Sequence, residues 1–232
     1  MTTVAIHQPN YLPWLGYFRK LMYSDFFVFF DNVQMPGGKS YMYRTAINMQ
    51  GRQHWLSVPV SNKSKFLPIC ETSIADNQWI KKHIRTLNLN YSYSPWKSLI
   101  NERISPVLEN QHSMLSSLNI DLITVLLDIL DIKDTTLIRA SDMELERNGA
   151  DSIKEILLKL KADSYITGKG KGTSRYLNKN EMHEIGVGVH FVSDNFPEYD
   201  QHRNEFIPGL SIIDVILNCG PEETRNILLK DF

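Results

Sequence analysis

Two side chains that can move protons or orient a base directly follow apolar stretches of the sequence. His7 comes after Val4–Ile6, and Asp31 comes after the run Phe26–Phe30. An imidazole titrates near neutral pH and can serve as a general base, and a carboxylate can orient it or hold a hydroxyl or ammonium group. We predict that His7 is a base or hydrogen-bond donor and that Asp31 works beside it. The alternative is that both side chains only fasten turns.

The segment after His7 is dense in groups that could contact a ligand. It reads Gln8-Pro9-Asn10-Tyr11-Leu12-Pro13-Trp14. Gln8 and Asn10 can hydrogen-bond a substrate, whereas Tyr11 and Trp14 could either stack on a base or sugar or belong to the core. A His-containing loop between a first strand and a helix is typical of nucleotidyltransferases, in which phosphates meet the helix N-terminus. The second His of their motif is missing, which counts against that mechanism.

A glycine-rich run near the middle of the C-terminal half predicts a phosphate contact. It begins Gly168-Lys169-Gly170-Lys171 and continues to Arg175. Glycines let backbone N–H groups approach an anion, and the Lys and Arg side chains supply positive charge. The spacing is not that of a P-loop, and the alternative is an exposed surface loop.

Polar residues recur at helical spacing close to the C-terminal end. Ser211, Asp214 and Asn218 share one face of a predicted helix, and Tyr199 and Gln201 precede it. This polar face either is solvated or belongs to a binding site. Asn218 is our candidate donor to an oxyanion, and the other four are candidate substrate contacts.

Two further side chains are weaker candidates. Cys219 would be a nucleophile only if its pKa were lowered, and nothing in the sequence indicates that. His83 lies on the apolar stripe of a predicted helix, so we expect a core histidine.

The elements that position these residues begin with a strand, a helix and a strand within about thirty residues, a pattern typical of a parallel pair. The helix is predicted from Pro13 to Tyr23, and a hairpin is predicted where Arg44–Asn48 and His54–Val58 flank a Gln-Gly turn. Because ligands bind at the carboxyl edge of open α/β sheets, His7 and Asp31 are expected at one such edge. Further helices are predicted at 77–89, 97–108, 114–130, 151–161, 211–217 and from 221, and further strands at 135–139, 164–167 and 187–192.

The sequence therefore predicts an α/β fold with an N-terminal β-α-β parallel-sheet core, an inserted β-hairpin and a helical C-terminal half. We find no repeat and no linker, so one compact domain over residues 1–232 is expected. The helix at 114–130 is apolar around most of its circumference and should be the central one.

Composition excludes several classes of protein. The chain has 232 residues, of which 42% are hydrophobic and 22% charged, as in folded globular proteins. No apolar stretch is long enough to span a membrane, and the start reads as a strand and not as a signal peptide. Two cysteines cannot form a metal knuckle or a disulfide scaffold, so we predict no metal site and a cytoplasmic location.

Charge is unevenly distributed along the chain. Residues 36–103 carry ten Lys and Arg against three Asp and Glu, whereas residues 104–232 carry thirteen against twenty-one. The basic segment either binds phosphates or another polyanion or pairs with the acidic half of the same chain.

Taken together, the motifs resemble the WbqC-like family over nearly the whole chain. The opening and closing motifs are the most specific part of the resemblance. It rests on His7-Gln8-Pro9, Tyr11-x-Pro13-Trp14-x-Gly16-Tyr17-Phe18, Asp25, Asp31-x-x-Gln34, Arg44, Pro59, Trp79, His83, Gly168-x-Gly170, Tyr199-x-Gln201 and Ser211-x-x-Asp214-x-x-x-Asn218-x-Gly220.

The resemblance implies a role in bacterial O-antigen and surface-polysaccharide biosynthesis. It implies an enzyme that adds an acyl or aminoacyl unit, glycyl being one candidate, to the amino group of a nucleotide-linked amino-deoxy sugar. The residue roles come from chemistry and placement and not from the resemblance: we predict that His7 is the base and that Arg44, with the lysines of the glycine-rich run, holds the pyrophosphate. Gln34 is expected to contact the substrate as well.

The acyl donor and the type of activity stay open at this point. An aminoacyl-tRNA, a carrier-protein thioester, a coenzyme A thioester and an acid activated by ATP all fit, and the oligomeric state is not predicted. The alternatives to a transferase are a binding or scaffold protein of the same pathway, without chemistry, and an enzyme that transfers adenylyl groups with Mg²⁺.

Overall fold

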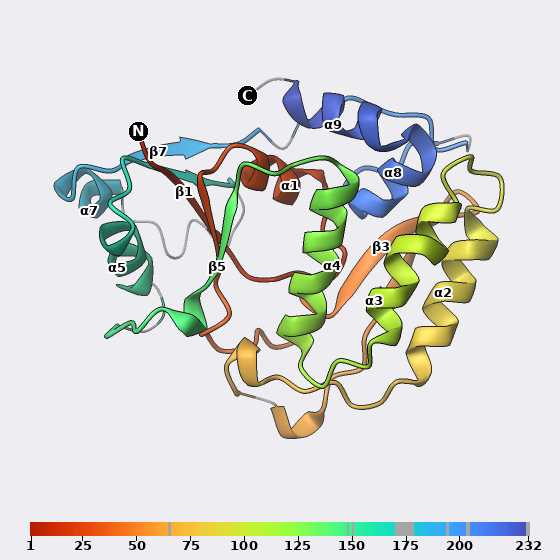
Figure 1. Ribbon diagram of the computed structural model, residues 1–232, viewed down its shortest axis with the longest axis horizontal. Coiled ribbons are helices and arrows are strands. Elements are labelled where there is room, and N and C mark those ends of the chain that lie inside the picture. The colour runs from red at the N-terminus through yellow and green to blue at the C-terminus, as the bar shows by residue number, and fades with distance from the viewer. Residues whose placement is uncertain are drawn as a thin grey trace.

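Five short strands form a parallel sheet in the order β5-β2-β1-β6-β7 (Figure 1). The computed structural model describes residues 1–64, 66–147, 149, 151–169, 179–193, 195–202 and 205–230. The sheet contains β1 (Thr3–His7), β2 (Phe26–Phe29), β5 (Thr136–Arg139), β6 (Ser164–Thr167) and β7 (Gly188–Phe191). Every neighbouring pair is parallel, which confirms the β-α-β opening.

Helices cover both faces of this sheet because successive side chains of each strand point to opposite faces. Ala5 of β1 belongs to the same buried cluster as residues of α1 (Leu15–Met22) and α4 (Leu115–Ile129). Its neighbours Val4 and Ile6 belong to the cluster that includes α5 (Asp151–Lys159). α5 and α7 (Lys179–Glu184) accordingly lie on one side of the sheet, and α1 and α4 on the other (Figure 1).

The strand order reverses between β1 and β6. From β1 the chain passes through α1 to β2 and then to β5, whereas from β6 it passes through α7 to β7 in the opposite direction. Connections that leave on opposite faces open a crevice at the carboxyl ends of the two central strands.

The predicted hairpin is also present, as β3 (Arg44–Met49) paired with β4 (Arg52–Ser57). Gln50 and Gly51 at its tip have φ values of 55° and 77°. Such positive values suit the two-residue turn whose twist matches the strands.

Three helices pack around this hairpin and the α1–α4 face of the sheet. They are α2 (Gln78–Asn90), α8 (Ile212–Cys219) and α9 (Pro221–Leu229). Sheet, helices and hairpin form one compact unit, as the sequence predicted.

Two sequence expectations about helices need correction, and one helix was missed. The helix predicted over 97–108 is a π-helical turn at Ile100–Ile104 followed by α3 (Ser105–Glu109). Pro106 lies in the first turn of α3, and its missing N–H interrupts a regular ladder there. The first helix begins at Leu15 and not at Pro13, because the Pro13 carbonyl accepts from the Ile212 N–H at 2.7 Å. Helix α7 was not predicted at all.

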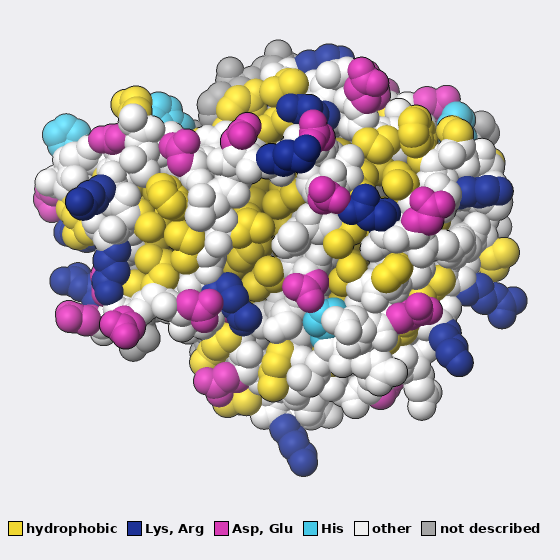
Figure 2. Space-filling view, viewed as in Figure 1, with side chains coloured by type: hydrophobic (Ala, Val, Ile, Leu, Met, Phe, Trp, Pro, Cys, Tyr) yellow, Lys and Arg dark blue, Asp and Glu magenta, His cyan; other side chains and the backbone are white. Residues whose placement is uncertain are grey.

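Acidic and basic side chains are interspersed on the face shown in Figure 2, with apolar patches between them. Among the described residues, the ion pair Arg103–Asp128 joins the basic segment 36–103 to the acidic half of the chain. The other ion pairs found in the described part do not involve that segment. Within the described ranges, no helix combines the length and apolar character needed to cross a membrane.

Candidate functional site

A cavity of about 740 Å³ lies at the carboxyl end of β1, where the strand order reverses. His7 ends β1 and Gly168 follows β6, so both central strands contribute to its lining. Much of the remaining wall is aromatic or apolar. Those wall residues include Trp14, Tyr41, Val192, Phe196, Tyr199, Phe206 and Leu210.

His7 is held in one orientation at this cavity. Its Nδ1 lies 3.0 Å from the Gln8 carbonyl oxygen, which can only accept, so Nδ1 carries the proton. Its ring contacts Trp14 and Tyr17 edge-on, with centroid distances of 5.9 and 4.8 Å. The other ring nitrogen, Nε2, is then unprotonated and carries a lone pair, and His7 is one of the residues that line the cavity.

The environment keeps this imidazole neutral. Burial, and secondarily the positive charge of Lys20, lower the pKa of His7 to about 3, although the bond to Gln8 acts in the opposite direction. A neutral His7 can accept a proton or a hydrogen bond at physiological pH.

The N-terminus of α1 is part of the same cavity. Trp14 caps the helix without a side-chain hydrogen bond, and Leu15 and Gly16, the first two helical residues, line the cavity. The first N–H groups of a helix have no partner within it and favour a negative charge. Lys20, one turn further along and buried, also reaches the lining. The arrangement suits a phosphate or diphosphate.

Asn119 of α4 fixes the loop that carries this site, and sequence reasoning missed this role. Its Nδ2 donates to the Pro9 carbonyl at 2.9 Å and to the Met42 carbonyl at 2.7 Å. The Tyr17 hydroxyl donates to the Gln8 carbonyl at 3.1 Å. The only signal in the sequence was an Asn within a helix that was predicted to be the central one.

Arg19 is a second positioning residue that the sequence analysis did not single out. It is fully buried and donates to the carbonyls of Ser193, Ile227, Leu228 and Lys230. Its guanidinium also lies 3.9 Å from the Phe196 ring centroid. Arg19 thus ties the end of α9 and one wall of the cavity to α1.

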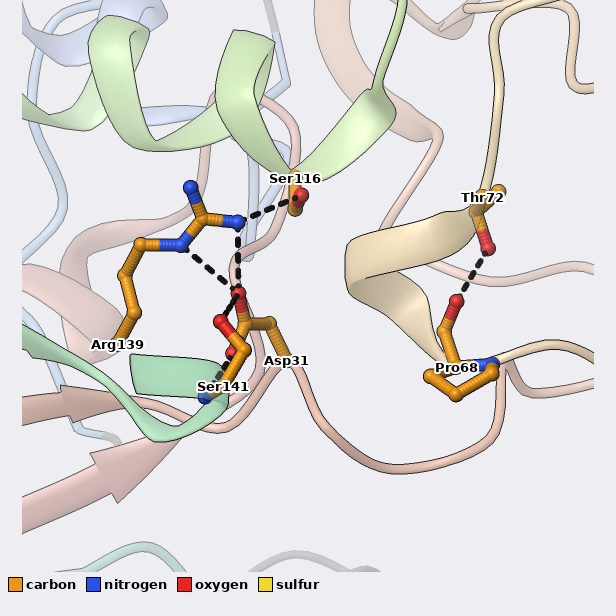
Figure 3. A network of polar contacts seen from close by, with 6 residues as sticks. All are labelled: Asp31, Pro68, Thr72, Ser116, Arg139 and Ser141. Atoms are coloured by element: carbon orange, nitrogen blue, oxygen red, sulfur yellow. Dashed lines mark hydrogen bonds and ion pairs between the residues drawn. The ribbon is translucent and has the colours of Figure 1, made fainter. Parts of the chain in front are cut away.

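Asp31 lies at a different part of the sheet edge, and it is not among the residues that line the cavity. It is fully buried, and its carboxylate accepts from Arg139 Nε at 3.0 Å and from the Ser141 N–H at 2.9 Å (Figure 3). The Ser141 hydroxyl donates at 3.0 Å, and Arg139 also reaches Ser116 of α4. These contacts join the ends of β2 and β5, and no contact between Asp31 and His7 is found among the described residues.

Asp214 is the centre of a second buried network. Its carboxylate accepts from the Tyr91 hydroxyl, the Tyr199 hydroxyl (2.8 Å), the Asn48 N–H (3.2 Å) and the Asn218 side-chain amide (3.2 Å). Burial raises the pKa of Asp214, although the four hydrogen bonds oppose that shift. Since Tyr199 lines the cavity, this network supports one of its walls.

The remaining C-terminal candidates also turn inward. Ser211 caps α8 and donates to the Leu12 carbonyl at 2.8 Å. Gln201 accepts from the Asn48 side chain at 2.9 Å. Asn218 accepts from the Tyr93 hydroxyl at 2.7 Å and, like Asp214 and Gln201, is not among the residues of the cavity lining.

The N-terminal candidates divide between core and surface. Tyr11 is buried, and its hydroxyl lies 2.9 Å from Nδ1 of the buried His83. Asn10 is buried and Gln8 half-buried, whereas Gln34 is exposed and its backbone pairs with Pro68. Trp14 lies in the cavity wall.

Only some of the basic candidates lie in the described part of the chain. Arg44 stacks on Trp55, with its Cζ 4.0 Å from the ring centroid, and it does not line the cavity. Lys169 is exposed beside Gly168. Gly170, Lys171 and Arg175 lie outside the described residues.

Metal ligands and thiols are the remaining groups to place in the described part of the chain. No group of three or more His, Cys, Asp or Glu side chains that could hold a metal ion occurs there. Both cysteines are free, and burial raises the pKa of Cys219 to about 11, which opposes a nucleophilic role.

A protein family and a curated protein each match this chain over almost its full length. The sequence profile of the WbqC-like protein family matches residues 8–226. The uncharacterized protein Rv1507c of Mycobacterium tuberculosis (strain ATCC 25618 / H37Rv) is 32% identical over 225 residues, which cover 96% of either chain. No solved structure matches.

Proposed function

This chain belongs to the WbqC-like protein family, and from the geometry of its cavity we propose that it is an N-acyl or N-aminoacyl transferase. The acceptor is the amino group of a nucleotide-linked amino-deoxy sugar of O-antigen biosynthesis, and glycyl is one candidate for the transferred group. One observation carries the proposal: His7 and the α1 N-terminus line the same cavity at the reversal of strand order.

The acceptor binds through its diphosphate. The N–H groups of Leu15 and Gly16 at the start of α1 and the buried charge of Lys20 offer a negative group both direct donors and a favourable field. The aromatic wall formed by residues such as Trp14 and Phe196 suits the base or the deoxy face of the sugar.

The proton leaves the acceptor amine through His7. The neutral amine attacks the acyl carbon, a C–N bond forms, and the bond from that carbon to the oxygen or sulfur of the donor breaks. His7 Nε2 takes the proton that the nitrogen loses and returns it to the departing group. A bound diphosphate raises the low pKa of His7 toward neutrality, so the base becomes effective with substrate present.

Two earlier role assignments change in this proposal. Asp31 does not orient His7, because Arg139 and Ser141 engage its carboxylate. Asn218 does not meet the oxyanion, because its amide bonds to Asp214 and Tyr93. Asn195, which lines the cavity, takes the place of the oxyanion donor.

The second candidate is a protein of the same pathway that binds the sugar nucleotide without chemistry. It is favoured by the fact that His7 contacts a carbonyl and two aromatic rings, and no carboxylate that would strengthen it as a base is found among the described residues. The two candidates share the cavity and differ in turnover.

The same proposal places the protein in the cytoplasm, where a reducing environment keeps thiols free. Cys70 and Cys219 are both free thiols.

Binding is tested first, by thermal-shift titration with dTDP- and UDP-linked amino sugars, their hydroxyl counterparts, coenzyme A, and ATP with and without Mg²⁺. A ligand at one hundred times its dissociation constant stabilises a folded protein by about 2.7 kcal/mol. We expect one amino-sugar nucleotide to raise Tm by several degrees and its hydroxyl analogue to raise it no more than half as far. Stabilisation by ATP and Mg²⁺ alone would instead indicate adenylyl transfer.

Turnover of the stabilising sugar is then followed by mass spectrometry with candidate donors. His7→Gln is expected to lose product formation by roughly 10²-fold or more while sugar binding persists. The matched control is His183→Gln, because His183 is exposed on α7 and lies outside the cavity lining. Equal product formation in both variants would remove His7 as the base, and binding without any product would favour the second candidate.

A further inference from the structure

Arg44 carries a charge that the described part of the protein does not neutralise. Its side chain is half-buried, and its Nε is fully enclosed without a hydrogen-bond partner. The ion pairs and hydrogen bonds of the described residues include none to this guanidinium. Buried donors are nearly always satisfied, so an unsatisfied one calls for a partner from outside the protein, and an anion suits a cationic group.

An aromatic ridge joins Arg44 to the cavity. The ring of Trp14, in the cavity wall, lies 5.4 Å from that of Tyr41, and Tyr41 lies 5.6 Å from Trp55 (centroid distances). Arg44 then stacks on Trp55. We name Trp14, Tyr41, Trp55 and Arg44 the aromatic–arginine ridge.

Tyr41, which lies between Trp14 and Trp55 in this ridge, is its exposed member. Tyr41 is 44% exposed, although its ring contacts two others. Aromatic rings of this kind are platforms on which nucleobases stack with little preference for sequence. The ridge thus offers a ring face for a base and, beside it, an unpaired cation for a phosphate.

We propose that the aromatic–arginine ridge is the donor subsite and that it binds the nucleoside phosphate of the acyl donor. The base stacks on Tyr41, a phosphate meets Arg44, and the acyl end enters the cavity past Trp14. The inference rests on the transferase proposed above and deepens it. Adenosine phosphates end both coenzyme A and aminoacyl-tRNA, so the shared chemistry is an adenosine phosphate.

The stacking of Arg44 on Trp55 also favours a phosphate over a simple counter-ion. The ring face holds the guanidinium plane in place, so little side-chain freedom is lost when a bidentate partner binds. A lysine would lack both the planar stacking and the paired donors.

Calorimetric titration with adenosine 3′,5′-bisphosphate tests the subsite. We expect binding by the unmodified protein and at least a tenfold rise in Kd for Arg44→Gln, because charge-assisted hydrogen bonds are lost. Arg52→Gln is the matched control, since Arg52 is exposed on the same hairpin and outside the ridge, and its Kd should change less than twofold.

The base is tested separately. Tyr41→Ala should raise the Kd by about fivefold or more, whereas Tyr41→Phe, which keeps the ring, should leave it nearly unchanged. Inorganic pyrophosphate and adenosine alone should each bind more weakly than the bisphosphate. No binding of the bisphosphate, equal effects of Arg44→Gln and Arg52→Gln, or pyrophosphate binding as tightly as the bisphosphate would overturn the proposal.

Two further titrations identify the source of the nucleotide and separate this inference from the proposed function. A short oligoribonucleotide ending in CCA and coenzyme A are compared, and the tighter one, lost in Arg44→Gln, identifies the donor class. The amino-sugar nucleotide is titrated into the same variant and should bind as in the unmodified protein. If the bisphosphate binds through Arg44 but no sugar nucleotide binds, the subsite stands and the transferase proposal fails. If sugar binding is lost in Arg44→Gln, the ridge belongs to the acceptor and the inference fails.

Discussion

Two places along one sheet edge carry a polar side chain at the end of a buried strand or just past it, and they differ in what surrounds that side chain. At β1 and β6, His7 faces a cavity of about 740 Å³ with one ring nitrogen available. At β2 and β5, Asp31 is fully buried and accepts hydrogen bonds from Arg139 and Ser141 (Figure 3).

Strand order accounts for the difference. The connections that follow β1 and β6 leave in opposite directions along the sheet. Neither connection therefore covers the crevice at the carboxyl ends of these two strands. From β2 the chain goes on to the adjacent β5, and residues after both strands can bond to one another. Position after a strand therefore predicts placement at the edge, but only the sheet order tells whether the edge is open to a ligand.

The largest expected effect is a loss of stability, and it comes from changing Asp31 at the ends of β2 and β5. We call this place the closed end, because protein groups occupy the carboxylate there. Asp31→Ala removes a buried carboxylate and leaves Arg139 and the Ser141 N–H without their acceptor. We expect a loss of about 3–5 kcal/mol in the free energy of unfolding, measured in urea. The folded fraction should bind the sugar nucleotide as before. A variant of normal stability that fails to bind would place Asp31 in the site.

The Asp214 network should give a smaller loss of stability together with a change in binding. Asp214→Asn keeps the shape of the side chain but replaces one carboxylate oxygen, an acceptor, by an NH₂ group, a donor. The four groups that donate to Asp214 then share a single acceptor oxygen. We expect about 2 kcal/mol less stability and, because Tyr199 loosens, a several-fold higher Kd for the sugar nucleotide. Both are measured on one preparation, by urea unfolding and calorimetry. Unchanged binding would separate the network from the cavity.

At the ends of β1 and β6, which we call the open end, His7 should make the stability of the protein depend on pH. The pKa of His7 is about 3 in the folded protein against an ordinary 6.5, so the unfolded chain binds more protons between those pH values. Stability from this group is full above pH 6.5 and falls as the pH decreases toward 3. His7→Gln should retain roughly 1 kcal/mol more of its pH 7.5 stability at pH 4.5, a value reduced by water in the cavity.

The comparison of the unmodified protein with His7→Gln contains its own control. His83, whose pKa burial lowers to about 4, titrates in both proteins and cancels in the difference. Parallel stability curves for the two proteins would contradict a neutral, enclosed His7.

The smallest expected effect is again at the closed end. Arg139 reaches the Ser116 hydroxyl at a long 3.3 Å, in addition to its contacts with Asp31. Ser116→Ala should therefore cost about 0.5 kcal/mol, measured by urea unfolding. A loss as large as that of Asp31→Ala would show that Ser116, and not the carboxylate, holds Arg139 in place.

Sequence reasoning predicted helices and strands better than it predicted which side chains bond to one another. The parallel opening, the hairpin and α4 follow from apolar period, turn residues and length, which are local. The pairing of Asp31 with Arg139 joins residues over one hundred positions apart, and no local pattern contains it.

The candidate site shows the same limit. His7, Trp14, Gly168 and Tyr199 were predicted and lie in the cavity lining. Lys20 was missed because a Lys in an amphipathic helix ordinarily faces water, whereas here it is buried and lines the cavity. Ser211, Asp214 and Asn218 do share a helix face, but only the tertiary fold shows that this face turns inward.

Hydrogen–deuterium exchange with and without the stabilising amino-sugar nucleotide tests the difference between the two strand ends most directly. The cavity assignment predicts slower exchange in peptides that contain the start of α1, within residues 7–20, and the wall residues 192 and 195–197. It predicts no change in peptides covering 31–35 and 139–142. Protection at 31–35 and 139–142 in place of the first pair would contradict the account and make the Asp31 end the ligand site.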